Sequence, residues 1–71
     1  MEANKKLQIK LYYVDGSEQF FTVNTDSVKL AKSDYKNRIM NKSWFEFKGE
    51  DGKETIVNTR NIVNVEFQVI Q

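Results

Sequence analysis

Apolar and polar residues alternate along several short stretches of this chain, and this alternation limits its fold more than any other feature. The first stretch, Lys6 to Val14, places every second side chain on one face: Leu7, Ile9, Leu11 and Tyr13. Successive side chains of a β-strand point to opposite faces, so the pattern predicts a strand with one buried face. By the same criterion we expect strands at residues 6–14, 18–24, 43–48, 53–58 and 62–70.

The turn between the first two strands contains Asp15-Gly16, a common hairpin signal. A two-residue loop would place Phe21 and Val23 on the polar face of the first strand, because a shift of one residue turns a whole strand over. We therefore predict a three-residue loop, Val14-Asp15-Gly16, formed by a type I turn and a glycine bulge.

The turn between the third and fourth strands contains a second Asp-Gly pair, Asp51-Gly52. Here a two-residue loop would place Phe47 opposite Ile56 and Glu50 opposite Lys53, an apolar pair and an ion pair. We predict the tight two-residue turn at this position.

Between residues 26 and 41 the apolar spacing becomes helical, with one stripe formed by Val28, Ala31, Tyr35 and Ile39. Asn24, Thr25 or Asp26 is expected to cap this helix, and Asp34 and Arg38 to form an ion pair within it. Leu30 points away from the stripe. The alternative is therefore a shorter helix capped by Ser33, after an extended segment from Ser27 to Ala31.

The order of elements is ββαβββ, which predicts one α+β, mostly β domain over residues 1–71, with residues 1–4 frayed. The five antiparallel strands form either a bent sheet or a small open barrel, with one amphipathic helix. The polar run from Asn58 to Asn61 predicts a single 3₁₀ turn before the last strand. The core is expected to contain Leu7, Ile9, Leu11, Phe21, Val23, Phe45, Phe47, Ile56, Val63, Val65 and Phe67.

The second hairpin, the polar turn and the last strand, within residues 43–70, resemble the end of SH3-like and Sm-like small barrels. The chain also resembles small uncharacterised proteins of Gram-positive bacteria and their phages. That likeness rests on its Lys and Asn content and on the run Ile56-Val57-Asn58-Thr59-Arg60-Asn61-Ile62. These resemblances imply a small barrel and an accessory role in a bacterium or phage, and they assign no functional residue.

The chain contains no Cys and no His, which removes thiol nucleophiles, disulfides and the commonest general base and metal ligand. Glu50-Asp51-Gly52 lacks the repeated acidic spacing of a calcium loop. We therefore expect no enzyme, no cofactor and no metal site. No apolar run approaches the roughly 20 residues of a membrane span, and no apolar stretch opens the chain as a signal peptide would. The expectation is a cytoplasmic protein without a membrane partner.

The formal charge is +1, but residues 27–45 alone carry five basic residues and one acidic residue. Lys29, Lys32 and Lys36 fall on one ridge of the expected helix beside its apolar stripe. Such a ridge can face phosphates or an acidic protein surface, or it can be a solvated helix face.

Three aromatic residues lie off the expected core face: Tyr12, Phe20 and Trp44. Exposed aromatic side chains form hot spots at protein interfaces and stack on bases in single-strand binders. The alternative is that the helix covers that face and the three side chains form a minor core.

Together these features predict a non-enzymatic binding module that acts through a protein–protein contact. The contact would use the aromatic face, the helix ridge or an exposed strand edge, and one form of it is self-association through the strand edge or the aromatic face. The alternative is a small nucleic-acid-binding barrel that uses Lys29, Lys32 and Lys36 with Tyr12, Phe20 or Trp44. A lysine ridge continuous with the exposed aromatic residues would favour this alternative.

Overall fold

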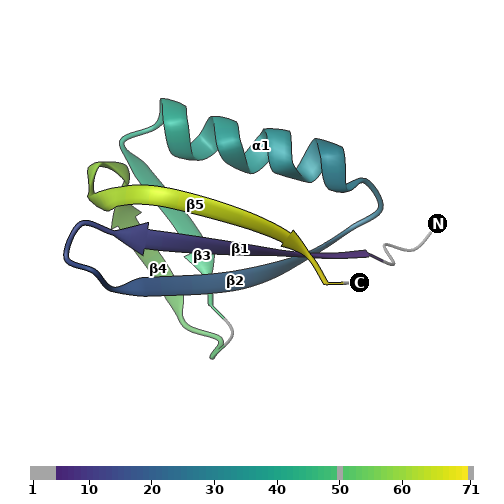
Figure 1. Cartoon of the computed structure of the whole chain (residues 1–71), viewed down its shortest axis with the longest axis horizontal. Helices are drawn as coiled ribbons and strands as arrows, with labels where there is room; N and C mark the ends of the chain where they lie inside the picture. The colour runs from purple at the N-terminus through teal and green to yellow at the C-terminus, as the bar shows by residue number, and fades with distance from the viewer. Residues whose placement is uncertain (1–4, 50, 71) are drawn as a thin grey trace.

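A computed structural model describes residues 5–49 and 51–70 of the chain (Figure 1). Its elements follow the predicted order ββαβββ, and strands predominate. They are β1 (Lys5–Tyr13), β2 (Glu18–Thr25), α1 (Val28–Asn41), β3 (Trp44–Lys48), β4 (Glu54–Asn58), the 3₁₀ turn η1 (Thr59–Asn61) and β5 (Ile62–Val69). The α+β, mostly β fold is therefore confirmed, while the fraying predicted for residues 1–4 lies outside the described residues.

The strands form two antiparallel sheets, with the orders β2-β1-β5 and β3-β4, and they do not form one five-stranded sheet or a closed barrel. In sequence α1 separates β2 from β3, and β3 pairs with β4. The β3–β4 hairpin crosses β1 at a steep angle in Figure 1, and α1 runs along the side of β5. The two sheets and α1 together enclose the core.

The first hairpin has the predicted three-residue loop, and Phe21 lies opposite Ile9. Gly16 closes the loop with a φ of 90°, and its N–H donates to the Tyr13 carbonyl at 3.0 Å. The Asp15 carboxylate accepts hydrogen bonds from the backbone N–H and the hydroxyl of Ser17, at 2.9 and 2.6 Å. Glycine adopts this left-handed conformation without the steric penalty of a side chain, which explains its place in the loop.

The second hairpin has the same turn as the first, so the predicted two-residue loop is wrong. Gly52 has a φ of 83°, its N–H donates to the Gly49 carbonyl at 3.0 Å, and the Asp51 carboxylate accepts from the Lys53 N–H at 3.0 Å. The extra loop residue turns β4 over. The predicted pair of Glu50 with Lys53 lies outside the described residues.

This register changes which β4 side chains face the core. Phe47 lies opposite Thr55, and Phe45 lies opposite Val57, which packs against the core. Ile56, predicted to be buried, lies opposite Glu46 on the outer face and is 62% exposed.

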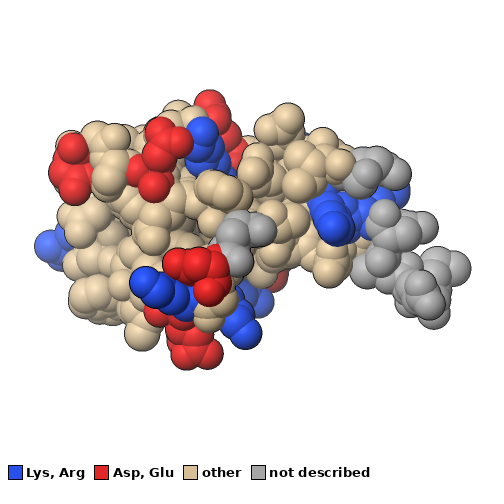
Figure 2. All heavy atoms as spheres, turned by 90° about the horizontal axis from the view of Figure 1, so that it is seen from below, with Lys and Arg blue, Asp and Glu red and all other residues tan. Residues whose placement is uncertain are grey.

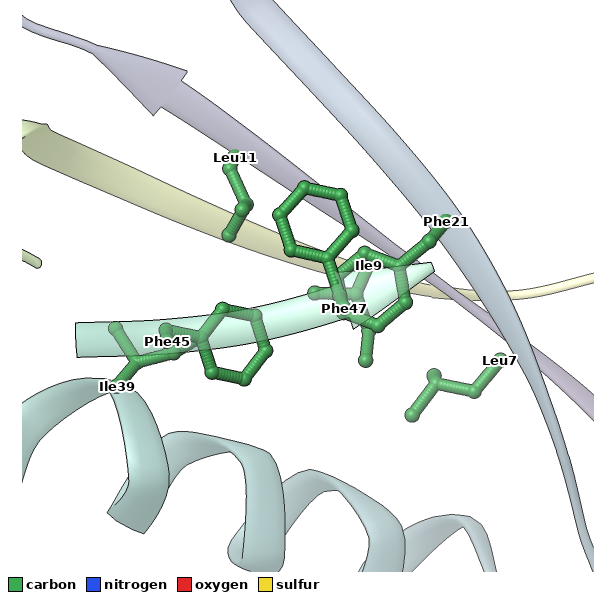
Figure 3. Packing of buried hydrophobic residues seen from close by; sticks show 7 residues of the cluster. All are labelled: Leu7, Ile9, Leu11, Phe21, Ile39, Phe45 and Phe47. Atoms are coloured by element: carbon green, nitrogen blue, oxygen red, sulfur yellow. The ribbon is translucent and has the colours of Figure 1, made fainter. Parts of the chain in front are cut away.

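The core consists of seven buried side chains: Leu7, Ile9, Leu11, Phe21, Ile39, Phe45 and Phe47 (Figure 3). The rings of Phe21 and Phe47 are stacked, with centroids 4.7 Å apart, and Phe45 lies beside both. Besides Ile56, one further predicted core residue is wrong: Val63 is exposed. The register of β5 shifts between Tyr12 and Tyr13, so that Ile62, which packs against the core, takes the place opposite Tyr13. The remaining predicted core residues are buried or packed against the buried cluster.

The longer helix is confirmed, and Ser27 caps it in place of the predicted Asn24, Thr25 or Asp26. The Ser27 hydroxyl accepts a hydrogen bond from the Leu30 N–H at 3.3 Å. The Thr25 hydroxyl in turn accepts from the Ser27 N–H at 3.0 Å, which holds the cap residue in place.

The predicted helix stripe faces the core. Ile39 is buried, and Val28, Ala31 and Tyr35 pack against the buried cluster. Leu30 points to solvent, as its position off the stripe requires.

Replacing Phe21 by Ala should destabilise the domain far more than replacing its neighbour Phe20. Phe21 is 2% exposed and Phe20 is 44% exposed. Removing a buried Phe costs about 3–5 kcal/mol, against a total stability of roughly 4–10 kcal/mol for a chain of this length. Urea unfolding of the Phe21→Ala and Phe20→Ala variants measures the difference. Equal losses would contradict the register of β1 and β2.

Gly16→Ala should lower the free energy of unfolding by about 1–2 kcal/mol, because an alanine with a positive φ is strained. No atom lies within 4 Å of the position that the added Cβ would occupy, so backbone strain alone would cause the loss. Gly16→Asn is the matched control, since Asn tolerates this conformation better and should lose less stability. Thermal unfolding that ranks Asn below Ala would contradict the assigned turn.

Candidate functional site

Trp44 begins β3 and lies on the outer face of the β3–β4 sheet, where it is 59% exposed. The alternation of β3 sends Phe45 and Phe47 into the core and leaves Trp44 on the opposite side. The alternative, in which α1 covers Tyr12, Phe20 and Trp44 as a minor core, is therefore wrong. Ile39 of α1 packs in the main core with the buried side chains of β1.

Trp44 shares a groove of about 600 Å³ with two other exposed apolar side chains, Ile56 and Val14. Each of these two residues is 62% exposed. The groove lies between the β1–β2 turn and the β3–β4 sheet. Its remaining lining residues are Tyr13, Asp15, Ser17, Gln19, Val57, Asn58 and Asn61.

Backbone hydrogen bonds of the η1 region connect both walls of this groove. The Val14 N–H donates to the Asn61 carbonyl at 2.8 Å, which attaches the β1–β2 turn to η1. The Thr59 N–H donates to the Ser43 carbonyl at 2.9 Å, which attaches η1 to the residue before Trp44. The two walls are thereby held relative to each other by the segment that follows β4.

The chemistry of the groove is apolar and hydrogen-bonding. Hydrogen bonds from Ser17 lower the pKa of Asp15, which keeps its carboxylate ionised at neutral pH. The Tyr13 hydroxyl donates to Gln19 at 2.6 Å, and burial raises the pKa of Tyr13. Within residues 5–49 and 51–70, no group of three or more Asp or Glu side chains is placed to hold a metal ion. This set of groups is suited to binding.

Tyr12 and Phe20 lie on the outer face of the β2-β1-β5 sheet, away from the Trp44 groove. The Tyr12 hydroxyl donates to Glu66 at 2.7 Å, and this hydrogen bond to the neutral phenol raises the pKa of Tyr12. Lys10 lies over the Tyr12 ring and forms an ion pair with Glu18 at 2.8 Å. Tyr12 is thus part of a polar network. Phe20 lies opposite Lys10, next to that network.

The lysine ridge of α1 lies on a third surface. Lys29, Lys32 and Lys36 line a hollow of about 420 Å³ together with Val28, Ser33 and Phe67 of β5. This hollow and the Trp44 groove have no residue in common. The six candidate residues therefore do not form one site: Trp44, the Tyr12–Phe20 pair and the lysine ridge lie on separate surfaces.

Ile56 and Val14 are neighbours of Trp44 that were not predicted from the sequence. The two-residue loop predicted for the second Asp-Gly turn places Ile56 in the core. Applying the three-residue loop of the first turn to the second would have placed Ile56 on the outer face with Trp44. Val14 had no comparable signal, since its place in the groove depends on the position of η1.

Seen from the side away from α1, the molecule carries acidic and basic side chains next to one another (Figure 2). Charges of both signs also alternate on the outer face of the β3–β4 sheet, where Lys48 lies opposite Glu54. The lysine ridge on α1 differs from these mixed surfaces because its three neighbouring side chains share one sign.

No family model, curated protein or solved structure matches this chain. Among the described residues, α1 is too short and too polar to cross a membrane.

Trp44→Ala should leave the fold intact and change the free energy of unfolding by less than about 1 kcal/mol, as is usual for an exposed side chain. Phe45→Ala is the matched control at the next position: its side chain is buried, so we expect a loss of about 3–5 kcal/mol. Tryptophan emission should lie at long wavelength and be quenched by acrylamide. Blue-shifted emission together with a large loss of stability would contradict the exposed position of Trp44.

Proposed function

We propose that this protein is a non-enzymatic binding module and that the Trp44 groove takes a segment of a protein partner. One observation carries the proposal: Trp44, Ile56 and Val14 are all exposed in a single groove. A contiguous exposed apolar patch on a small domain usually marks an interaction surface. Trp is also the residue type most enriched among interface hot spots.

The composition of the groove supports a protein ligand over a nucleic acid. Asp15 is the one charged residue among its described lining residues, and its carboxylate repels phosphate. A single-strand binder would place basic side chains next to stacking aromatic rings. Here the lysine ridge lines a different hollow.

The ligand that fits best is a peptide segment with an apolar side chain for the surface between Trp44 and Ile56. The amide side chains of Gln19, Asn58 and Asn61 at the groove would pair with the backbone of such a segment. The absence of His and Cys from the chain agrees with binding without catalysis. The proposal extends to a cytoplasmic accessory role in a Gram-positive bacterium or phage, with a fold related to the SH3-like small barrels.

Selection from a random peptide library on the wild-type protein should yield ligands that contain apolar residues and bind at this groove. Trp44→Ser should weaken their binding by about thirtyfold, the effect of a typical hot spot. Ile56→Ser should weaken it by a smaller factor. Isothermal titration calorimetry on both variants measures these changes.

Leu30→Ser is the matched control, because Leu30 is an equally exposed apolar residue on α1, outside the groove. This variant should bind the selected peptides as the wild type does. Equal losses in the Leu30 and Trp44 variants would exclude a specific groove. Ligands that bind without dependence on Trp44 or Ile56 would refute the proposal, and so would concentration-dependent self-association through the groove, which would identify a second copy as the occupant.

A further inference from the structure

The outer edge of β5 has no strand neighbour among the described residues, because β5 ends the sheet order β2-β1-β5. The Ile70 N–H donates to the Lys6 carbonyl at 3.0 Å. Ile70 therefore directs its N–H toward β1, and this direction alternates from one residue to the next along an antiparallel strand. The N–H and C=O groups of Val65, Phe67 and Val69 consequently point away from β1. Such a row of unpaired groups is a template for a further strand.

Two hollows follow one another along this edge, between β5 and α1. The first holds the lysine ridge and Phe67, and the second, of about 500 Å³, is lined by residues that include Met40, Val63 and Val65. Figure 1 shows α1 running beside β5 along most of its length. The edge of β5 therefore borders two hollows: a basic one near Phe67, and one near Val63 in which apolar side chains lie beside Arg60.

The three lysines of the ridge take part in no ion pair among the described residues, so their charges can bind a ligand. Lys29, Lys32 and Lys36 are exposed, and the ion pairs in the described part of the chain are Lys10–Glu18 and Arg38–Asp34. At a rise of about 1.5 Å per residue, the three lysines span about 10 Å of helix. Side chains on one face of an extended strand repeat every 6.6 Å or so, so two acidic residues at alternate positions fit within this span.

The apolar side chains of the second hollow match a different kind of ligand side chain. Met40 is 72% exposed and Val63 is 62% exposed, and both line the second hollow. An apolar residue placed there would cover surface that water now contacts.

We propose that an extended, acidic segment of a partner protein adds to β5 as a further strand. Its backbone pairs with Val65, Phe67 and Val69, and its acidic side chains at alternate positions face Lys29, Lys32 and Lys36. An apolar side chain on the same face lies beside Met40 and Val63. Main-chain pairing supplies part of the affinity in this mode of recognition, and the side chains supply the specificity.

Charge complementarity argues against a second copy of this chain as the occupant. The β5 residues that share the face of Phe67 are apolar, and no described strand carries acidic residues at two alternate positions. A second copy would leave the lysines without partners. The lysine ridge also disfavours strands with basic side chains, which makes the edge selective.

The direct test uses a terminally blocked peptide of about eight residues, long enough to run along β5. It carries Glu at two alternate positions and Val at the next position on the same face, and the reversed sequence is tested as well because a strand can add in either direction. Amide NMR should show shifts at Val65, Phe67 and Val69 and slower exchange of these amides with solvent.

Substituting the three lysines together, Lys29→Gln, Lys32→Gln and Lys36→Gln, should weaken binding of the peptide by about four- to ninefold, since its two glutamates form two exposed ion pairs that contribute about two- to threefold each. The matched control changes the same amount of charge elsewhere: Lys42→Gln, Lys48→Gln and Lys53→Gln. This control should keep the wild-type affinity to within about twofold. All six side chains are exposed, so both triple variants are expected to fold.

A second peptide, N-methylated at the amides that would pair with β5, separates strand addition from simple charge attraction. It should lose binding although its charge is unchanged. The proposal is overturned if the N-methylated peptide binds equally well, if the lysine variant binds unchanged, or if single-stranded DNA binds through the lysines while neither peptide does. Trp44→Ser should bind the acidic peptide normally, so this result is independent of the function proposed for the Trp44 groove.

Discussion

The buried face of β1 packs against three phenylalanine rings, and this contact holds the two sheets together. Leu7, Ile9 and Leu11 are fully buried, and β1 is also the central strand of its sheet. The phenylalanines come from β2 and β3, so this one cluster joins the two sheets. From α1, Ile39 is buried in this cluster and Tyr35 packs against it. All buried hydrophobic side chains of the described residues belong to this one cluster.

The two Asp-Gly turns decide which side chains this core receives and which remain outside. In each turn the Asp carboxylate accepts the N–H two residues later, and the Gly takes a positive φ. The added loop residue sets Val57 against the core and turns Ile56 outward. The groove beside Trp44 is therefore a consequence of the same turn that completes the core, since an inward Ile56 would leave Trp44 without this apolar neighbour.

The two proposed binding surfaces differ in physical character. The Trp44 groove offers apolar area with amide groups at its border, which suits a segment with an apolar anchor. The β5 edge offers backbone hydrogen bonds and positive charge, which suits an extended acidic strand. They share no described lining residue, so a single domain of this size could contact two segments of one partner, or two partners, at once.

The element order, the first hairpin, the helix stripe and most of the core could be predicted from the sequence, because alternation and helical spacing are local properties of each segment. The bulge in β5 and the division into two sheets were settled only in the folded chain, because both depend on contacts between distant segments, as when the shift opposite Tyr13 brings Ile62 inward in place of Val63. The Ser27 cap and the turn that sets the register of β4 are local, but the sequence offers several possible cap residues and two possible loop lengths at these places. The candidate residues Trp44, Tyr12, Phe20 and the three lysines were recognised from their patterns. The patterns did not show which of these residues share a surface, because that depends on how η1 and α1 pack against the strands.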